Sequence, residues 1–310
     1  MTQEPSIAVD FAGIHLANPV FTASGTCGYA DELEGLADVH ALGGFITKSI
    51  TAQPRKGNRP PRIVETDAGM LNAIGLANVG LDRFIDEKLP LLRQMGVPVF
   101  VNVAGATIED YVQVVERLAD EQAISGFELN ISCPNVKKGG ITFGTDPGQV
   151  TKITTAVRQA ARAKVLMVKL SPAITDITVT ARAAVQAGAD ALSLVNTFTA
   201  MVIDVETRRP VLANRTGGLS GPAIRPIAVY LVSRVYREVT RDCRIPILGL
   251  GGIHTASDAL EFIFAGASAV AVGTGTFVDP ACAPRIVEGL KDYCTRHRIG
   301  NIRELIGSLE

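Results

Sequence analysis

Apolar and polar residues follow one rhythm along most of this chain. Short apolar runs rich in Val, Ile and Leu are each followed by a longer segment whose apolar residues recur with helical spacing. This alternation is typical of βα units, in which helices connect and cover parallel strands. It predicts eight strands, at residues 20–23, 44–49, 99–104, 127–132, 165–170, 191–196, 246–251 and 269–273. Helices are predicted to begin near Asp31, Leu81, Ile108, Pro147, Asp176, Ala223, Ala256 and Ala281.

Several helix ends carry local signals. Asp176 and Ser257 can accept hydrogen bonds from free N–H groups of a first turn, and Pro147 suits a first helical position. Gly188 and Gly266 stand where helices commonly end. Eight strands, each followed by a helix, predict a (β/α)8 TIM barrel. An open doubly wound sheet is the alternative, but it would rarely need eight evenly spaced units.

Three segments depart from the rhythm. Residues 5–19 alternate apolar and polar positions around Ala12-Gly13, which predicts a β-hairpin over the closed bottom of the barrel. Insertions at 51–80 and 197–222 follow the second and sixth strands, where the catalytic face of a barrel lies. Their glycines, prolines and scattered apolar residues predict ordered loops over a ligand. We expect residues 1–310 to form one barrel domain.

Composition narrows the class of protein. Of the 310 residues, 47% are hydrophobic. The 30 basic and 31 acidic residues leave a formal net charge of −1. The sequence also has no long basic run of the kind that binds nucleic acid. Five cysteines without CxxC or Cys/His spacing argue against a disulfide framework or a metal site and favour the cytoplasm. The N-terminus has no signal-peptide pattern, and no apolar run is long enough to span a membrane.

Polar residues gather at the predicted strand ends. Amides there offer both donors and acceptors, which suits a ligand with alternating ring N–H and C=O groups, such as a pyrimidine or a flavin edge. A single asparagine would more simply be a turn or cap residue, but the same feature recurs at six strand ends. The residues are Ser24, Lys48, Ser49, Asn102, Asn130, Lys169, Asn196 and Thr197, joined by Asn72 from the first insertion.

Cys133 follows the fourth strand, at a break made by Pro134. A free cysteine is usually a small buried hydrophobe. Here the amides of Asn130 and Asn135 flank it and a Lys-Gly-Gly loop follows, which a core cysteine would not need. We therefore interpret Cys133 as a catalytic candidate.

Lysine and glycine complete the candidate site. Lys169 ends an apolar strand, so its ammonium needs a partner: a reduced flavin, or a salt bridge inside the barrel. The last two strands end in Gly251-Gly252 and in Gly273-Thr274-Gly275, each followed by a helix. Backbone N–H groups at such ends can approach a phosphate.

The motifs resemble a known family. Asn-Ile-Ser-Cys-Pro-Asn at 130–135 is similar to the active-site loop of class 1 dihydroorotate dehydrogenases. The segments 22–25, 47–49, 71–76, 196–197 and 216–222 extend the likeness over nearly the whole chain, and 72–75 and 213–221 resemble the class 1B catalytic subunit. Val79 departs from the pattern, where the family would be expected to have proline.

The resemblance implies a function and a set of site residues. It implies oxidation of dihydroorotate to orotate in pyrimidine biosynthesis, with Cys133 as the base at C5, Lys48 beside it, and hydride transfer from C6 to one FMN per chain. FMN would be held by Ser24, Lys48, Ser49, Asn102, Asn130, Lys169, Val195, Gly221, Gly251, Gly252, Gly273 and Thr274. Substrate would be held by Lys48, Asn72, Ala73, Ile74, Gly75, Leu76, Asn130, Asn135, Asn196 and Thr197.

The resemblance also implies partners. An FAD and 2Fe-2S subunit would pass electrons to NAD+, around a homodimer core within a heterotetramer. Three alternatives remain open: a class 1A enzyme that uses fumarate, a flavin-free enzyme acting on a phosphate sugar, and a barrel that only binds a ligand.

Overall fold

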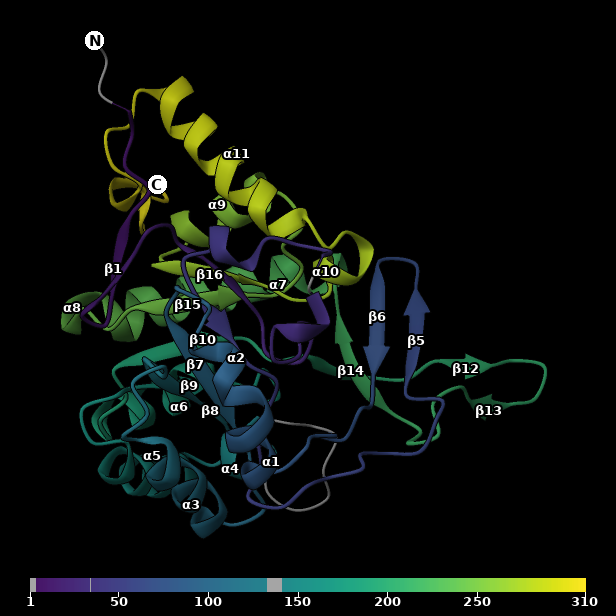
Figure 1. The fold of residues 1–310 in the computed structure, drawn as a ribbon. Coiled ribbons are helices and arrows are strands. Elements are labelled where there is room, and N and C mark those ends of the chain that lie inside the picture. The colour runs from purple at the N-terminus through teal and green to yellow at the C-terminus, as the bar shows by residue number, and fades with distance from the viewer. Residues whose placement is uncertain (1–3, 34, 133–140) are drawn as a thin grey trace.

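Eight parallel strands form the centre of the molecule in the computed structural model, which describes residues 4–33, 35–132 and 141–310. They are β3 (Val20–Thr22), β4 (Phe45–Ile46), β7 (Val99–Val103), β8 (Gly126–Asn130), β9 (Val165–Lys169), β10 (Ala191–Leu194), β15 (Ile247–Leu250) and β16 (Ala269–Val272). Their order is β3-β16-β15-β10-β9-β8-β7-β4, and a parallel bridge between Phe21 and Gly44 joins its two ends. The sheet therefore closes, and the predicted (β/α)8 barrel is confirmed (Figure 1).

The apolar runs form these strands because both faces of each are covered. Every residue of β8 and β9 is buried, from Gly126 to Asn130 and from Val165 to Lys169. Strands covered on both faces read as nearly continuous apolar sequence. The observed strands end one to three residues before the predicted ends, so the last polar residues of each run lie at the rim of the barrel.

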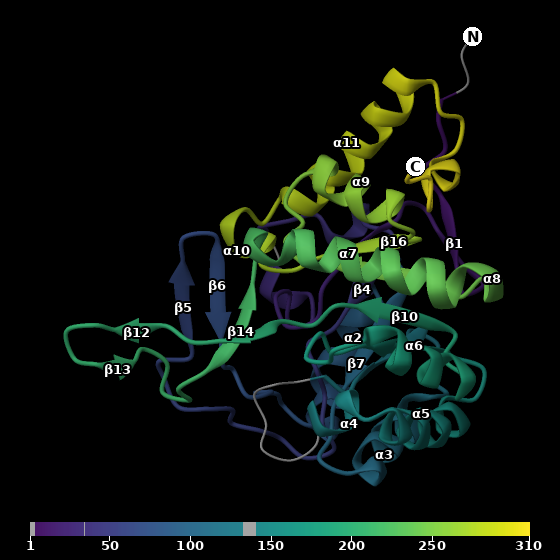
Figure 2. The same cartoon turned by 180° about the vertical axis from the view of Figure 1, so that it is seen from behind.

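Helices cover the outside of the barrel (Figure 2). They are α1 (Leu81–Arg83), α2 (Leu89–Leu92), α3 (Ile108–Leu118), α4 (Ile141–Thr145), α5 (Pro147–Ala161), α6 (Ile177–Gln186), α7 (Arg225–Val235), α8 (Arg241–Cys243), α9 (Ala256–Phe264), α10 (Gly275–Val278) and α11 (Cys282–His297). π-helical turns at Phe84–Lys88 and Tyr236–Thr240 make α1–α2 and α7–α8 continuous helical stretches.

Most predicted helix ends are observed. Asp176 caps α6 by accepting from the Thr178 N–H, Pro147 opens α5, and Gly188 and Gly266 follow their helices with positive φ. Two expectations are wrong. The segment at Asp31–Leu33 is a single 3-10 turn rather than an α-helix. Ser257 is not the cap of α9.

The cap of α9 is Thr255, two residues before Ser257. Its side chain accepts from the Asp258 N–H, and the Asp258 carboxylate accepts from the Thr255 N–H in return. This reciprocal capping box satisfies two of the free N–H groups of the first turn. Thr255 and Ser257 both have a hydroxyl that could cap the helix. Thr255 is the cap because the first turn of α9 begins at Ala256.

The N-terminal hairpin closes one end of the barrel. β1 (Val9–Phe11) and β2 (Ile14–Leu16) pair antiparallel around Ala12-Gly13, as predicted. The ring of Phe11 is fully buried, 5.9 Å from the ring of Phe21 and 6.3 Å from that of Phe100. Phe100 lies near the start of β7, so the hairpin covers the end opposite the polar rim.

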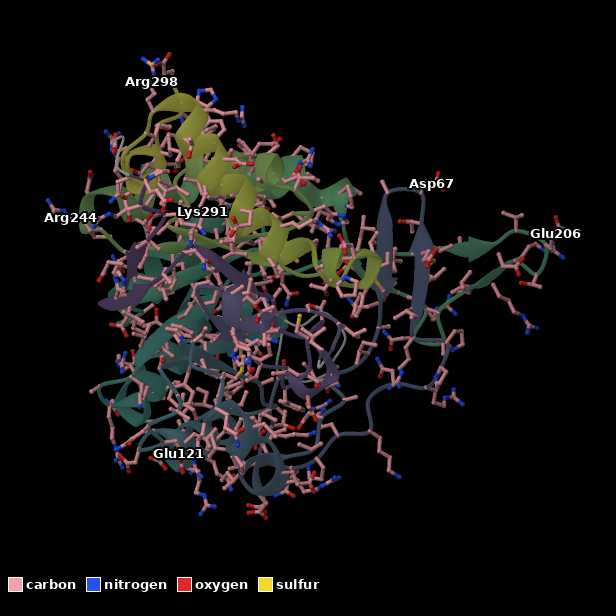
Figure 3. The ribbon with its side chains drawn as sticks, turned by 45° about the horizontal axis from the view of Figure 1, so that its top comes forward. Asp67, Glu121, Glu206, Arg244, Lys291 and Arg298 are labelled. Carbon is pink, nitrogen blue, oxygen red and sulfur yellow. The ribbon has the colours of Figure 1, made fainter. Side chains whose placement is uncertain are left out.

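The two insertions form a sheet rather than loops. β5 (Ile63–Thr66), β6 (Gly69–Asn72), β11 (Phe198–Ala200) and β14 (Gly217–Ser220) pair in the order β11-β14-β6-β5, with a second hairpin of β12 (Ile203–Asp204) and β13 (Arg209–Pro210). We call this unit the extension. Asp67 and Glu206 mark the tips of its two hairpins (Figure 3). Its strands pair across the two insertions, so neither insertion alone predicts the sheet.

Candidate active site

A cavity of about 740 Å³ lies at the carboxyl ends of the barrel strands. Residues following β3, β4, β10, β15 and β16 line it, together with Asn130 and Lys169 at the ends of β8 and β9. The extension adds a wall through Ile63, Val64, Glu65 and Met70. The extension therefore covers the polar rim, which is the position where ligands bind in barrels of this kind.

The cavity brings together most of the residues that the sequence predicts for a site. The predicted residues that line it are Ser24, Lys48, Ser49, Asn72, Ile74, Gly75, Leu76, Asn130, Lys169, Val195, Asn196, Thr197, Gly221, Gly251, Gly252, Gly273 and Thr274. They come from seven barrel strands and both insertions.

Two predicted residues do not line the cavity. Asn102 is fully buried beneath it, in contact with Ser49 and Asn130. Ala73 packs into a small core of the extension with Leu71 and Leu212. Cys133 and Asn135 lie outside the described residues.

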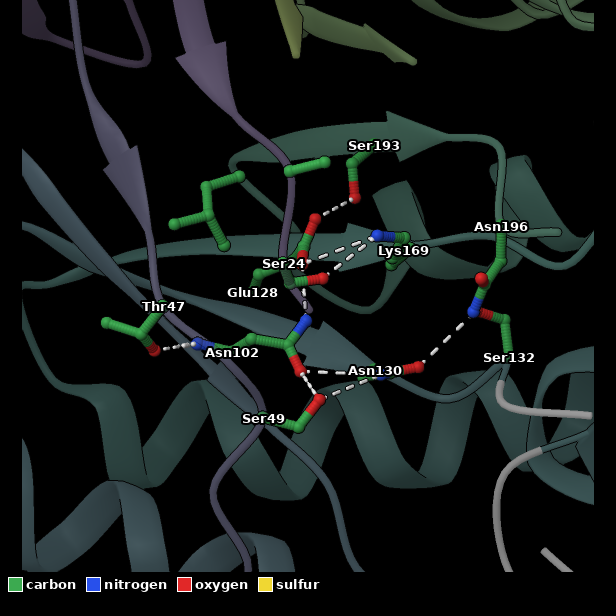
Figure 4. A network of polar contacts seen from close by, with 12 residues as sticks. Ser24, Thr47, Ser49, Asn102, Glu128, Asn130, Ser132, Lys169, Ser193 and Asn196 are labelled. Carbon is green, nitrogen blue, oxygen red and sulfur yellow. Dashed lines mark hydrogen bonds and ion pairs between the residues drawn. The ribbon is translucent and has the colours of Figure 1, made fainter. Parts of the chain in front are cut away.

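A buried carboxylate stands beneath the cavity (Figure 4). Glu128, fully buried in β8, accepts hydrogen bonds from the Ser193 hydroxyl (2.9 Å) and from the Asn102 side-chain amide. The ammonium of Lys169 lies 3.7 Å from its Oε2 atom. That ammonium also donates to the Ser24 hydroxyl, at 3.2 Å. The Lys169 ammonium therefore lines the cavity and has the buried Glu128 carboxylate as its counter-charge.

The strand register explains this cluster. Asn102 lies beside Glu128 on neighbouring strands, and Lys169 lies beside both Asn130 and Ser193. Side chains two residues apart on a strand point the same way, so Glu128 and Asn130 both face the barrel interior. The polar residues thus form a contiguous layer just below the rim.

The opposite end of the cavity is made of backbone. Gly252 has a φ of +75°, and a Cβ built on it would lie 2.6 Å from the carbonyl oxygen of Gly221. Only glycine fits there without displacing backbone. Nearby, the Thr274 hydroxyl donates to the Ser220 hydroxyl at 2.7 Å. Ser220 was not among the predicted residues, because the sequence alone did not indicate that it pairs with the eighth strand end.

Burial disfavours the thiolate form of two cysteines, Cys27 and Cys282. Burial is the main cause that raises the pKa of the Cys27 thiol, and it raises the pKa of Cys282 to about 11. Hydrogen bonds with Thr26 and Thr276 act in the opposite direction on Cys27. A thiol needs to be ionised to act as a base or nucleophile, so neither is suited to that role at neutral pH.

The sequence interpretation missed several polar residues of the site. Glu128, Ser132 and Ser193 take part in its hydrogen-bond network, although none was predicted to. A signal was present for Glu128, since it alternates with Asn130 on one strand. Ser132 and Ser193 gave no comparable signal, because serine is common at strand ends and in turns.

Two kinds of feature are absent from the described ranges 4–33, 35–132 and 141–310. No three His, Cys, Asp or Glu side chains come together there in a way that could hold a metal ion. No helix in the same ranges has the length and hydropathy needed to cross a membrane.

Known proteins resemble this chain over its whole length. The family model for dihydroorotate dehydrogenase matches residues 6–294. The curated "Dihydroorotate dehydrogenase B (NAD(+)), catalytic subunit" of Geotalea uraniireducens is 52% identical over 306 residues, which are 99% of each chain. Proteins of the same name from Geotalea daltonii and Geobacter sulfurreducens are also 52% identical, over 307 and 308 residues.

A solved structure extends the likeness to three dimensions. The crystal structure of DHODH from Eimeria tenella in complex with ferulenol aligns with a TM-score of 0.82 at 25% identity. The alignment covers 98% of this chain and 88% of that one. Family model, curated relatives and fold agree, and the chain belongs to the dihydroorotate dehydrogenase family.

Proposed function

We propose that this chain oxidises dihydroorotate to orotate, as the catalytic subunit of an NAD+-linked enzyme of pyrimidine biosynthesis. The observation that carries the proposal is the cavity that gathers Lys48, Asn72, Asn130, Lys169 and Asn196. Family membership and 52% identity to curated catalytic subunits of the B type support the same reaction.

FMN is the cofactor that we propose for the cavity, and the residues fit it. A volume of about 740 Å³ is ample for a flavin mononucleotide and a small ring. Gly251, Gly252 and Gly273 present backbone at one end, where a phosphate can approach. Lys169, Ser49 and Asn130 present a cation, a hydroxyl and an amide at the other end, which suits the polar edge of a flavin ring.

The chain's own residues would bind the substrate and move its protons. FMN, when bound, supplies a hydride acceptor. Asn72, Asn196 and Thr197 would orient the ring through its amide groups, and Lys48 would attract its carboxylate. Cys133 would remove the C5 proton as a thiolate. The extension would exclude water from the ring through Met70 and Ile74.

The first test is anaerobic addition of dihydroorotate to the purified chain. We expect a yellow protein whose visible absorbance bleaches. A yellow protein that does not bleach would contradict the substrate, and a colourless one that takes up no FMN would favour a flavin-free barrel enzyme or a binding barrel.

Cys133→Ser tests the proposed base. We expect flavin reduction by dihydroorotate to slow by at least about a hundredfold, which is the usual scale for loss of a general base. Stopped-flow absorbance measures the rate, and Cys243→Ser, which changes an exposed cysteine, is the matched control. Reduction of the Cys133 variant at the parent rate would reject the assignment.

Electrons should leave through another protein. The sequence has no cysteine cluster for an iron–sulfur centre, so we propose an FAD and 2Fe-2S partner on a homodimeric core. The chain alone should then not reduce NAD+ after bleaching. Turnover with fumarate by the chain alone would instead indicate the class 1A reaction.

A further inference from the structure

The hydrogen bonds beneath the cavity all run in one direction. Asn196 donates through Nδ2 to the Ser132 hydroxyl at 2.9 Å, and Ser132 donates to Asn130 Oδ1 at 3.5 Å. Asn130 donates through Nδ2 to Asn102 Oδ1 at 3.3 Å, and Asn102 donates to Glu128. We call these five residues the amide chain (Figure 4).

The charge of Glu128 explains the direction. A carboxylate can only accept hydrogen bonds, whereas a side-chain amide can turn either its NH2 or its oxygen toward a neighbour. Oε2 of Glu128 accepts from the Asn102 NH2 and lies 3.7 Å from the Lys169 ammonium, which has donors only. With that cation beside Oε2, the NH2 of Asn102 faces the carboxylate and its oxygen faces away.

The orientation of the Asn102 side chain in turn fixes the orientation of the Asn130 side chain. With its NH2 on Glu128, Asn102 turns its oxygen to Ser49 and Asn130, both of which donate to it. Asn130 donates through its NH2 to Asn102 Oδ1 and to Ser49 Oγ, at 3.3 Å each. Its side-chain oxygen therefore faces Ser132 and the cavity.

The far end of the chain has the same direction. Asn196 accepts from the Thr197 N–H at 2.8 Å through its oxygen, so its NH2 faces Ser132. Reversal of Asn130 would set its oxygen against the oxygen of Asn102, and reversal of Asn196 would set its NH2 against the Thr197 N–H. Each inverted contact inside a buried network is costly, because an unsatisfied polar group keeps no compensating water.

We propose that Glu128 is the positioning residue of this site. Its buried carboxylate sets the donor and acceptor pattern that Asn130 presents to a ring ligand, and it places a counter-charge beside Lys169 at the cavity floor. Glu128 does not line the cavity, so it acts through Asn102 and Lys169. The identity of the ligands in this inference rests on the proposed function, while the role of Glu128 in the network does not.

Exchange of the two groups at positions 102 and 128 tests the proposal. Glu128→Gln removes the charge at nearly constant shape, and Asn102→Asp sets two carboxylates against each other. In the double variant, the new amide at position 128 donates to the new carboxylate at position 102, which still accepts from Asn130 and Ser49. Every bond from Asn196 to position 102 then keeps its direction, the bond between positions 102 and 128 is reversed, and the negative charge moves to position 102. Glu121→Gln is the control, because it makes the same carboxylate-to-amide change at a partly exposed ion pair with Arg93 that does not line the cavity.

We expect three readouts to follow this pattern. Each single variant should weaken FMN binding to the apoprotein and orotate binding to the flavinated protein by at least about tenfold. The double variant should recover at least half of that loss on a logarithmic scale, and Glu121→Gln should stay within about twofold of the parent. Fluorescence quenching and the flavin spectrum measure the two affinities.

The flavin potential is a readout that packing alone would not move. Glu128→Gln should shift the two-electron reduction equilibrium about tenfold toward reduced flavin, or about 30 mV, because Lys169 loses its counter-charge. The double variant should return to the parent value. Two outcomes would overturn the proposal. In the first, the losses of the two single variants multiply in the double variant. In the second, Glu128→Gln has the same affinities and flavin potential as the parent.

Thermal unfolding of the apoprotein separates this inference from the proposed function. If the parent binds neither FMN nor orotate, the proposed function fails, and the unfolding midpoints decide the inference. Lowered midpoints in both single variants with recovery in the double variant support it. Equal lowering in the double variant rejects it.

Discussion

Lys169 shows how a single residue in this site depends on its neighbours. Its side chain is 5% exposed, and its ammonium lies between the Glu128 carboxylate and the Ser24 hydroxyl. Water is nearly excluded, so the cation is stable there because a carboxylate stands beside it. An additional negative group in the cavity, such as a reduced flavin, would find a cation already in position.

Replacement of Lys169 by Ala should have two effects. FMN retention should fall at least about tenfold, and stability should fall by about 3 kcal/mol, because Glu128 is left buried without its cation. The flavin-to-protein ratio and urea unfolding measure these effects. Lys164→Ala is the control, since Lys164 donates to the carbonyls of Glu121 and Ile124 away from the cavity. Full flavination and full activity of the Lys169 variant would contradict its role.

Cys282 makes stability depend on alkaline pH. Its folded pKa is about 11, raised by burial above the ordinary 9.0. A raised pKa contributes stability below the unfolded value, and that contribution is lost as pH rises through the folded value. The free energy of unfolding should therefore fall between pH 9 and pH 11, by on the order of 1 kcal/mol from this group after solvent screening is discounted.

Cys282→Ser isolates that contribution. Its stability should change less than that of the parent over the same pH range, while Cys243→Ser, at an exposed position, should follow the parent. Parallel curves for the parent and the Cys282 variant would show that another group causes the alkaline loss.

At the scale of elements, the junction after β15 carries a strict backbone requirement. Gly252 has a φ of +75° and lies against the Gly221 carbonyl. A side chain there would strain the backbone and would collide with that carbonyl oxygen. Gly96 has a φ of +66° but nothing within 4 Å of an added Cβ. The two glycines therefore separate backbone strain from loss of the cavity wall.

Gly252→Ala should lower FMN affinity at least about tenfold, whereas Gly96→Ala should not change it. Both variants should lose about 1 kcal/mol of stability or more, the cost of a left-handed residue with a Cβ. FMN titration and thermal unfolding measure the two effects. Equal FMN affinity in the Gly252 variant would remove that glycine from the cofactor site.

At the scale of the whole molecule, the packing that closes the barrel and the cavity that binds ligands lie at opposite ends of the barrel. The hairpin residue Phe11 closes one end against Phe21 and Phe100, and the cavity opens at the other end under the extension. Changes at the closed end should therefore alter stability without altering the ligands.

Phe11→Ala should destabilise the protein by about 3 to 5 kcal/mol, the range for a fully buried phenylalanine. FMN affinity of the folded protein should stay within about twofold of the parent. Tyr230→Ala, at a 57% exposed position on α7, is the control and should change stability by less than about 0.5 kcal/mol. A Phe11 variant that folds fully but loses FMN would show that the two ends are coupled.

The sequence by itself determined the barrel, the polar rim and the family. Apolar periodicity is local, and parallel strands buried on both faces leave a strong signal, so all eight strands could be predicted. Strand ends of a barrel meet at one face, so the order of the strands along the chain was enough to predict that Lys48, Asn130, Lys169 and Asn196 line one cavity.

Only the tertiary structure decided which groups meet across the chain. Asn72 donates to the carbonyl of Gly218, 146 residues away, and that pairing turns two insertions into one sheet. Ala73 faces the core of that sheet, and Asn102 faces Glu128 rather than the cavity. Such contacts depend on register between distant strands, which local periodicity cannot specify. Whether a polar side chain faces a ligand or another buried polar group is therefore decided by the fold.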